Sequence, residues 1–303
     1  MMSKEKIQAE INAAMASGLY SVAGLNMFDI VEKLEISENL SLHLEYTEEI
    51  LFEFLSELVE LDGKEPGLSE YLKAIKAGDV IDNQLLEKEN SFLIGLYHNL
   101  SRETAIDNLI NFSKTNRQLT GNDLFKLHNT LLTGTSSSNT ESIRTKNTKF
   151  VGRFVNGERV IDYFPIDYKE VIEASNKLAE LYNNRFTENL FDNVFIQPFL
   201  IHGLIGALQI FNDGNTRMGR VMQHALMWQL INEKTKFNFV LPPIYATRSY
   251  YPNRGKYREK ISNLVKENNN QAWNDWFDFN LNGIEDNIYA SRENVKALKR
   301  QFK

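Results

Sequence analysis

Hydrophobic side chains between residues 199 and 230 recur every three or four positions in two successive runs. The first run holds Phe199, Leu200, Leu204, Ile205, Leu208 and Phe211, and the second holds Met218, Val221, Met222, Leu226, Trp228 and Leu230. This spacing places each set on one face of an α-helix. The runs are separated by Asp213-Gly214-Asn215-Thr216, so the sequence predicts a helix, a short polar loop and a second helix.

Most of the remaining chain is also predicted to be helical. Amphipathic patterns predict helices over residues 4–16, 23–34, 41–61, 69–76, 84–99, 105–112, 123–132 and 168–183. Residues 150–163 differ, because Asn156-Gly157 lies between arms rich in Val and Phe, which is a strong β-hairpin signal. The pattern therefore predicts a mainly α protein with a single hairpin.

Composition and charge narrow the class of protein. The chain has 303 residues, which suits one large domain or one and a half, and its 42% hydrophobic and 24% charged content is that of an ordinary globular protein. A net charge of −6 argues against a broad nucleic-acid-binding surface or an anionic membrane surface. We therefore expect neither nucleic acid nor membrane among its partners.

Cysteine and histidine content limit the chemistry. The absence of cysteine excludes disulfides and thiolate metal sites, and the five histidines are too scattered for a zinc motif. No apolar run approaches the roughly 18 residues that a membrane span needs. The N-terminal stretch is charged and lacks the apolar core of a signal peptide. These features favour a cytoplasmic protein.

The polar loop has the chemistry of an anion site. A loop followed by a helix N-terminus directs several backbone N–H groups at one point, where the helix dipole also favours negative charge. Arg217 and Arg220 could bind phosphates, and Asp213 is an oxygen ligand suited to Mg²⁺. From spacing alone, an ordinary turn with solvated arginines stays an equal alternative.

These residues resemble the signature loop of the Fic/Doc (Fido) family, which reads H-x-F-x-D/E-G-N-G-R-x-x-R. The positions that match in register are Phe211, Asp213, Gly214, Asn215, Arg217 and Arg220. Two positions depart from the pattern. Gln209 stands where the family has its catalytic histidine, and Thr216 stands where the family has its last loop glycine, so the signature is degenerate.

The resemblance implies a fold and a division of the chain. It implies the Fic fold, a helical bundle with one β-hairpin flap, preceded by an N-terminal helical region. On this basis we expect an N-terminal helical region at 1–115, a Fic core at 116–265 and C-terminal helices at 266–303, with the flap at 143–163 and the signature loop at 209–220. The aromatic cluster Trp273 to Phe279 is expected in the core, and Tyr250 and Tyr251 are candidates to border an adenine pocket.

The resemblance also implies an activity, the transfer of AMP from ATP to a hydroxyl group of a protein. By this match Asp213 would hold Mg²⁺, Phe211 would anchor the loop, and the phosphates would be bound by Gly214, Asn215, Thr216, Arg217 and Arg220. The flap residues Phe150, Val151, Gly152 and Arg153 would bind an extended segment of the target protein. Proteins of the family often form dimers, which makes a homodimer an expectation that no feature of the sequence tests.

Gln209 puts this activity in doubt. A carboxamide cannot take up a proton near neutral pH, and general-base assistance is worth roughly 10²–10⁴-fold in rate. His202 cannot replace the base, because seven helical residues place it about 10 Å away along the axis. We therefore expect a protein that is impaired or inactive in AMPylation and retains its nucleotide-binding loop. The alternatives are a transferase of AMP, phosphate or another phosphorylated group by a base-independent route, and an interaction protein with a relic site.

Residues 17–26 weakly resemble the inhibitory helix that many Fic proteins carry, S/T-x-x-x-E-G/N. The best fit starts at Ser21 and puts Leu25 where the inhibitory glutamate would lie, and the register from Ser17 puts Ser21 there. Neither register supplies a carboxylate. A simple connection between helices is the equal alternative.

Overall fold

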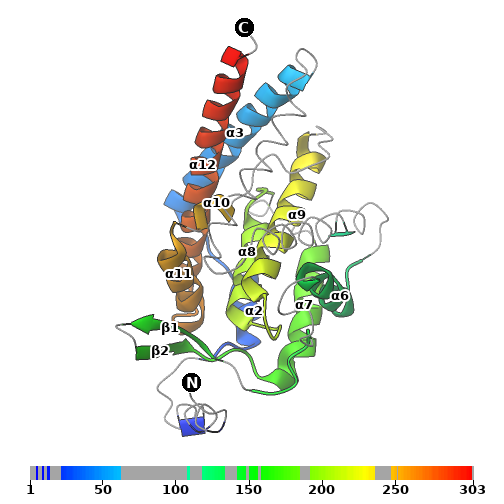
Figure 1. Cartoon of the computed structure of the whole chain (residues 1–303), viewed down its shortest axis with the longest axis vertical. Coiled ribbons are helices and arrows are strands. Elements are labelled where there is room, and N and C mark those ends of the chain that lie inside the picture. Colours follow the sequence, from blue (N-terminus) through cyan, green and yellow to red (C-terminus); the bar gives the residue numbers. More distant parts are fainter. Residues whose placement is uncertain are drawn as a thin grey trace.

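The computed structural model describes residues 5, 9, 12–13, 22–62, 108–109, 118–133, 142–147, 150–155, 158–184, 192–235, 247–250 and 252–301. This part of the chain is mostly helical (Figure 1). Its elements are α2 (Asn26–Glu32), α3 (Glu38–Asp62), α6 (Gly121–Leu132), β1 (Val151–Val155), β2 (Glu158–Tyr163), the 3-10 turn η1 (Tyr168–Glu170), α7 (Val171–Asn183), α8 (Ile196–Leu208), α9 (Asn215–Thr235), α10 (Thr247–Tyr250), α11 (Arg254–Lys266) and α12 (Asn270–Gln301). The fold class predicted from the sequence, mainly α with a β-hairpin, is confirmed.

Helix α8 lies at the centre of the bundle, and every one of its residues is buried. Helices α7, α9, α11 and α12 all contact it. Two glycines let the neighbouring helices approach closely: a Cβ on Gly203 would lie 2.8 Å from the ring of Trp273, and one on Gly206 would lie 2.7 Å from Ile261. A helix that is apolar on all sides is typical of the core of a large protein, and this one carries the signature loop at its C-terminal end.

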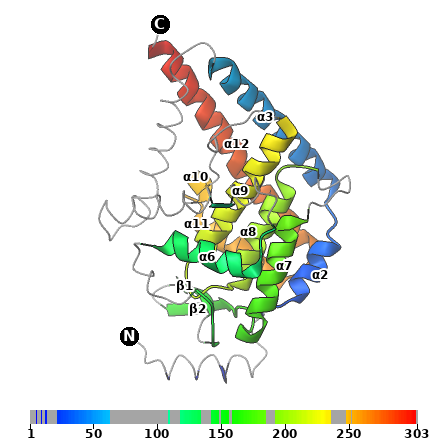
Figure 2. The same cartoon turned by 90° about the vertical axis from the view of Figure 1, so that its right-hand side faces the viewer.

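The longest helices, α3 and α12, run side by side (Figures 1 and 2). The first half of α12 also belongs to the core, because Trp273, Trp276 and Phe277 have no exposed surface. The Nε1 of Trp276 donates to the carbonyl oxygen of Phe199 on α8 at 2.8 Å. The expectation that this aromatic cluster is core is confirmed. One hydrophobic core joins residues from α2 to α12, and the division into three regions stays a prediction.

Strands β1 and β2 form the antiparallel hairpin that the sequence predicts, with an irregularity between Val151 and Gly152. A Cβ on Gly152 would lie 2.4 Å from the carbonyl oxygen of Val160, so only glycine fits there. The turn at 156–157 lies outside the described residues. Just beyond β2, Phe164 forms a parallel bridge with Val22 and accepts a hydrogen bond from the N–H of Ala23 at 2.9 Å.

The helix bounds differ from the predicted ones by a few residues at α3 and α6, and more clearly in two other helices. The predicted helix 23–34 is shorter, Asn26–Glu32, because the chain at 22–23 is extended against Phe164. The predicted helix 168–183 begins with the turn η1. The helices predicted at 69–76 and 84–99, almost all of those at 4–16 and 105–112, and the alternative register from Ser17 lie outside the described residues. Leu25 lies in the turn that precedes α2.

None of the helices in the described part of the chain has an apolar stretch long enough to cross a bilayer.

Candidate phosphate-binding loop

The signature loop begins where α8 ends, at Gln209. This residue adopts a left-handed conformation, with φ 53° and ψ 51°, which a non-glycine residue adopts only at some energetic cost. Its side-chain Nε2 donates to the carbonyl oxygen of Gly206 at 2.6 Å, and the side chain is 8% exposed. The hydroxyl of Tyr163, at the end of β2, donates to the same oxygen at 3.0 Å. The amide of Gln209 is therefore turned back onto α8 and shares an acceptor with the hairpin.

Phe211 fixes the middle of the loop. Its side chain is fully buried, stacks on the ring of His128 with centroids 4.0 Å apart, and meets Phe125 edge-on at 5.8 Å. Asn215 holds its backbone from the other side, because Oδ1 accepts from the N–H of Phe211 and Nδ2 donates to its carbonyl, both at 2.9 Å. A direct phosphate contact by the Asn215 amide would require one of these bonds to be given up, and that contact stays a prediction.

Residues 142–143, which follow α6 in the chain, and His128 on α6 also hold the loop backbone. The N–H of Asn212 donates to the carbonyl of Ser142 at 3.1 Å, and its side-chain Nδ2 donates to the carbonyl of Ile143 at 3.0 Å. His128 on α6 donates through Nε2 to the carbonyl oxygen of Asp213 at 2.7 Å. Its Nδ1 lies 2.8 Å from the hydroxyl of Ser142. The loop backbone is thus held by Asn215, by residues 142–143 and by His128. A backbone that is fixed before a ligand binds is the condition for a preorganised anion site.

Gly214 makes the turn into α9. It has φ 72°, and an added Cβ would lie 3.1 Å from Leu132 and 3.2 Å from His128. Its carbonyl accepts from the N–H of Met218 at 2.8 Å, the first bond of the α9 helix. The first N–H groups of a helix have no partner within that helix, and here they belong to the stretch that begins at Asn215. Thr216, in the position of the family's last loop glycine, is the second residue of α9 and is partly exposed.

The charged side chains lie on the more exposed side of the loop. Asp213 accepts from the N–H of Gly214 at 2.7 Å through Oδ1 and from Nη2 of Arg217 at 3.1 Å through Oδ2. The two side chains are 51% and 23% exposed, and Arg220 is partly exposed. The inward side of the loop therefore holds its backbone, while the outward side carries the paired Asp213 carboxylate and Arg217 guanidinium near the N-terminus of α9.

This donor set fits Mg²⁺ only together with phosphate. In the described part of the chain no three His, Cys, Asp or Glu residues lie close enough to hold a metal ion by themselves. Mg²⁺ is usually bound through one or two carboxylates, several waters and the phosphate oxygens of a substrate. Asp213 supplies one carboxylate, so the residues present fit a magnesium ion that arrives with a nucleotide.

His202 lies beneath the loop and has no exposed surface. Its Nδ1 is hydrogen bonded to Oε1 of Gln223, and its Nε2 lies 2.8 Å from the hydroxyl of Tyr257. Burial, and next the charge of Arg220, lower the pKa of His202 well below its ordinary value. The ring is therefore neutral and enclosed, which agrees with the expectation that it does not replace the missing base.

Tyr250 lies in the hydrophobic core. Its side chain is 4% exposed, and its hydroxyl lies 2.5 Å from Oδ1 of Asn280 and 3.1 Å from Oε1 of Gln223. Two polar partners and the rings of Tyr257 on α11 and Phe279 on α12 enclose Tyr250, and its place beside an adenine pocket stays a prediction. Tyr251, the other candidate, lies outside the described residues.

Sequence reasoning missed the residues that hold the loop backbone, which are His128, Ser142 and Ile143. It also missed Gln223 and Tyr257, which hold the buried ring of His202. A weak signal existed for His128, because the run Leu127 to Gly134 resembles the helix that opens the Fic core. Tyr257 had no such signal. The flap residues Phe150, Val151 and Gly152 are partly buried beside or in β1, and their predicted contact with a target protein stays a prediction.

Helix α8, the anchored loop that follows it and the hairpin are the features that point to a class of protein. Residues 118–227 match the model of the Fic/DOC family, a stretch that contains α6, the hairpin, α7, α8 and the first half of α9. The chain therefore carries a Fic/DOC family domain.

One solved structure is similar over most of the chain. It is the crystal structure of a Fic family protein from Desulfovibrio desulfuricans G20, with a TM-score of 0.59 and 15% sequence identity. The alignment covers 87% of this chain and 76% of that chain. This likeness shows that the Fic fold extends over most of the chain. A search of curated proteins found no match.

Proposed function

We propose that this protein binds ATP with Mg²⁺ at its signature loop and transfers AMP slowly or not at all. The observation that carries the proposal is the placement of Gln209, whose amide donates into the end of α8 at the position of the family's catalytic histidine. The charged side of the same loop keeps Asp213, Arg217 and Arg220. The binding groups are present, and the group that would accept a proton is replaced.

The loop can bind phosphates through its backbone and its two arginines. The N–H groups at the start of α9 and the positive end of its dipole favour an anion, and Arg217 and Arg220 supply charge-assisted hydrogen bonds. Bound Mg²⁺ would neutralise phosphate charge, with Asp213 as its protein ligand. Asp213 and Arg217 bind each other in the structure, and such an exposed pair contributes only about 0.3–0.5 kcal/mol, so a nucleotide can separate them at little cost.

Gln209 changes the proton transfer step. With Nε2 donating to Gly206, its Oε1 can only accept a hydrogen bond, which orients a hydroxyl group without removing its proton. The absence of a base reduces the rate by roughly 10²–10⁴-fold. Binding and transfer are therefore separated in this protein, and the function that the site supports best is that of a nucleotide-binding or regulatory module.

The binding half of the proposal is tested by calorimetric titration of ATP–Mg²⁺ into the wild-type protein and into Arg217→Ala. A matched control is Arg292→Ala, because Arg292 pairs with Glu53 and Glu57 on α3, outside the signature loop. We expect binding to the wild type and to the control, and at least a tenfold weaker affinity in Arg217→Ala. No binding to the wild type would leave the loop a relic.

The transfer half is tested with ATP labelled on the α-phosphate and a mixture of candidate target proteins, using the wild type and Gln209→His. We expect a labelled product with Gln209→His and at least a hundredfold less with the wild type. Equal labelling by both proteins would show a base-independent transferase instead. Arg217→Ala combined with Gln209→His serves as the control, and it should label nothing.

A further inference from the structure

Arg144 is the most deeply buried cation in the described part of the chain. It is 2% exposed, and no other lysine or arginine among the described residues is as buried. Its Nη2 donates to the carbonyl oxygen of Ile166, while its Nε has no hydrogen-bond partner in the part that the structure describes. Burial lowers the pKa of Arg144 to about 10, and the group is therefore still charged at neutral pH. Burying a charge with so few partners costs free energy, so the bond to Ile166 is expected to serve the fold or the site.

The bond between Arg144 and Ile166 joins the chain that enters the hairpin to the chain that leaves it. Arg144 precedes β1, and Ile166 follows β2. Asn147, which is partly exposed, makes a second link between the same two chains. Its Nδ2 donates to Oδ2 of Asp167 at 3.0 Å, and its Oδ1 accepts from the N–H of Tyr168 at 3.0 Å. The base of the hairpin is therefore closed by one buried link and one partly exposed link.

The same two chains hold the signature loop, one on each side of Gln209. The N–H of Ile166 donates to the carbonyl oxygen of Leu208, the residue before Gln209, at 3.2 Å. On the other side, Ile143 forms an antiparallel bridge with Phe211. Gln209 thus lies between two fixed points of the backbone, and the buried guanidinium joins the chains that fix them.

We propose that Arg144 is a positioning residue for Gln209, which it keeps in the left-handed conformation with its amide turned onto Gly206. Gln209 has φ 53°, and a non-glycine residue keeps such a conformation only where its surroundings hold it there. Its side-chain bond to Gly206 fixes the direction of the amide. The inference rests on the proposed function, because in that site the amide of Gln209 orients a hydroxyl group.

The variants Arg144→Met and Asn147→Ala separate this role from general support of the hairpin. Methionine is apolar and unbranched, so it can fill the buried space, and replacing a buried charge by an apolar side chain is often neutral for stability. Asn147→Ala removes the other link between the same two chains. A general loosening of the hairpin would therefore appear in both variants, whereas the loss of a positioning residue appears only in Arg144→Met.

The first test measures AMP transfer in the Gln209→His background. There Arg144→Met should lower kcat roughly 10- to 100-fold, because the residue at position 209 is misplaced. Calorimetry should show an ATP–Mg²⁺ affinity within about twofold, because Asp213 and Arg217 are unchanged. Asn147→Ala should lower neither quantity. An unchanged kcat in Arg144→Met, or an equal fall in kcat and ATP affinity, would overturn the proposal.

The second test needs neither nucleotide nor transfer. The Nε2 signals of Gln209 in ¹⁵N-glutamine-labelled protein are identified by their disappearance in Gln209→His. They should relax as a rigid group in the wild type and in Asn147→Ala, and as a flexible one in Arg144→Met. If Arg144→Met does not fold, Arg144→Lys decides, because an ammonium group keeps the charge and lacks the guanidinium fork.

We expect intermediate relaxation of the Gln209 amide in Arg144→Lys, and relaxation as in the wild type would then count against the proposal. If Gln209→His transfers no AMP, the transfer half of the proposed function fails, and the relaxation of Gln209 still decides what Arg144 does. Identical relaxation in the wild type, Asn147→Ala and Arg144→Met would show that Arg144 does not position Gln209.

Discussion

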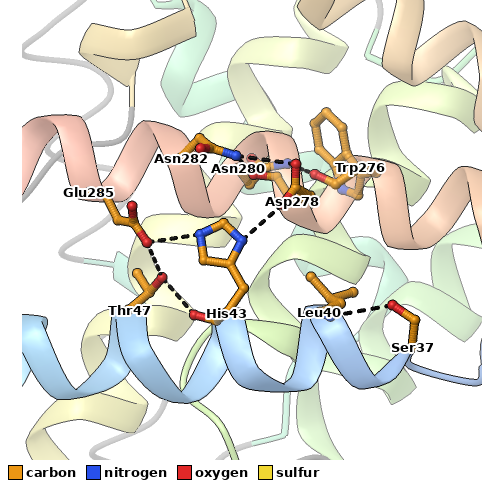
Figure 3. Close-up of polar contacts among 9 residues, drawn as sticks. All are labelled: Ser37, Leu40, His43, Thr47, Trp276, Asp278, Asn280, Asn282 and Glu285. Atoms are coloured by element: carbon orange, nitrogen blue, oxygen red, sulfur yellow. Dashed lines mark hydrogen bonds and ion pairs between the residues drawn. The ribbon is translucent and has the colours of Figure 1, made fainter.

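Among the described residues His43, His128 and His202 have both ring nitrogens hydrogen bonded, and His43 and His202 lie in very different regions. His202 is fully buried under the signature loop, with Gln223 and Tyr257 as its partners. His43 lies between α3 and α12, where Nδ1 is 2.9 Å from Asp278 and Nε2 is 2.8 Å from Glu285 (Figure 3). The ring of His43 is 19% exposed.

The partners set the charge that each ring needs. Carboxylates only accept, so both bonds of His43 are formed together only when both of its nitrogens carry a proton. His202 has one partner that accepts and one that can donate, and burial beside Arg220 disfavours a charge there. Thr47 belongs to the cluster around His43, and its hydroxyl donates to Oε1 of Glu285 at 2.7 Å. The difference teaches that a histidine can join two helices near the surface through carboxylate partners, and can orient a hydrogen-bonded series as a neutral group in the core.

The largest effect on stability is expected from Gly219→Ala, which lies in the region around His202. The added methyl group would lie 2.6 Å from the ring of His202 and close to its backbone, so α8 and α9 must move apart at a cost of about 2–3 kcal/mol in the free energy of unfolding. The matched control is Gly255→Ala on α11, where nothing lies within 4 Å of the new methyl group and helix propensity favours alanine by about 1 kcal/mol. Urea denaturation of both variants would contradict this view if their stabilities changed in the same direction.

The next effect is a dependence of stability on pH that comes from His202. Its pKa in the folded protein is well below the ordinary value of about 6.5 that it has when unfolded, so the unfolded chain binds a proton that the folded protein does not. This group therefore lowers the free energy of unfolding as the pH falls, by about 2 kcal/mol between pH 7 and pH 5. Urea denaturation of the wild type and His202→Asn at both pH values measures it, and parallel changes in the two proteins would rule it out.

A smaller effect is expected at the other histidine. His43→Phe keeps a ring between α3 and α12 and removes both contacts with carboxylates, at a cost of about 1 kcal/mol because the cluster is partly exposed. This cost should shrink in about 0.5 M NaCl, since salt screens charges that contact water. The cost of Gly219→Ala should not shrink. Stability measured in urea at low and high salt would refute the comparison if both variants responded alike.

The smallest effect on stability is expected from Arg217→Ala. The exposed pair with Asp213 spans one turn at the start of α9, and such pairs contribute about 0.5 kcal/mol or less. Thermal denaturation should show almost no change, although we expect the same variant to lose ATP affinity. A large loss of stability would show that Arg217 is part of the framework of the loop, as Asn215 and His128 are.

The sequence predicted the loop better than its surroundings. Its helical periods and the Asp213-Gly214 break gave the two helices and the start of α9, and the Asn156-Gly157 signal gave the hairpin. The end of α8 was missed, because the helix stops at Leu208 and Phe211, predicted on its buried face, lies in the loop. The predicted helix at 23–34 was too long, because pairing with Phe164 overrides local helix propensity. The burial of Tyr250 against Asn280 was not predicted, because the two residues are 30 positions apart in the sequence and no local pattern links them.

Local pattern therefore determined the mainly helical fold, the hairpin and the degenerate signature with Gln209, since periodicity and turn chemistry act between residues close in the chain. Only the tertiary structure decided that Gln209 turns onto Gly206, that His128 holds Asp213 from 85 residues away, and that Tyr257 reaches His202 across 55 residues. These contacts arise from the packing of α6 and α11 around a buried helix. The hydrophobic period of each helix shows which face is buried, and it does not show which helix will cover that face.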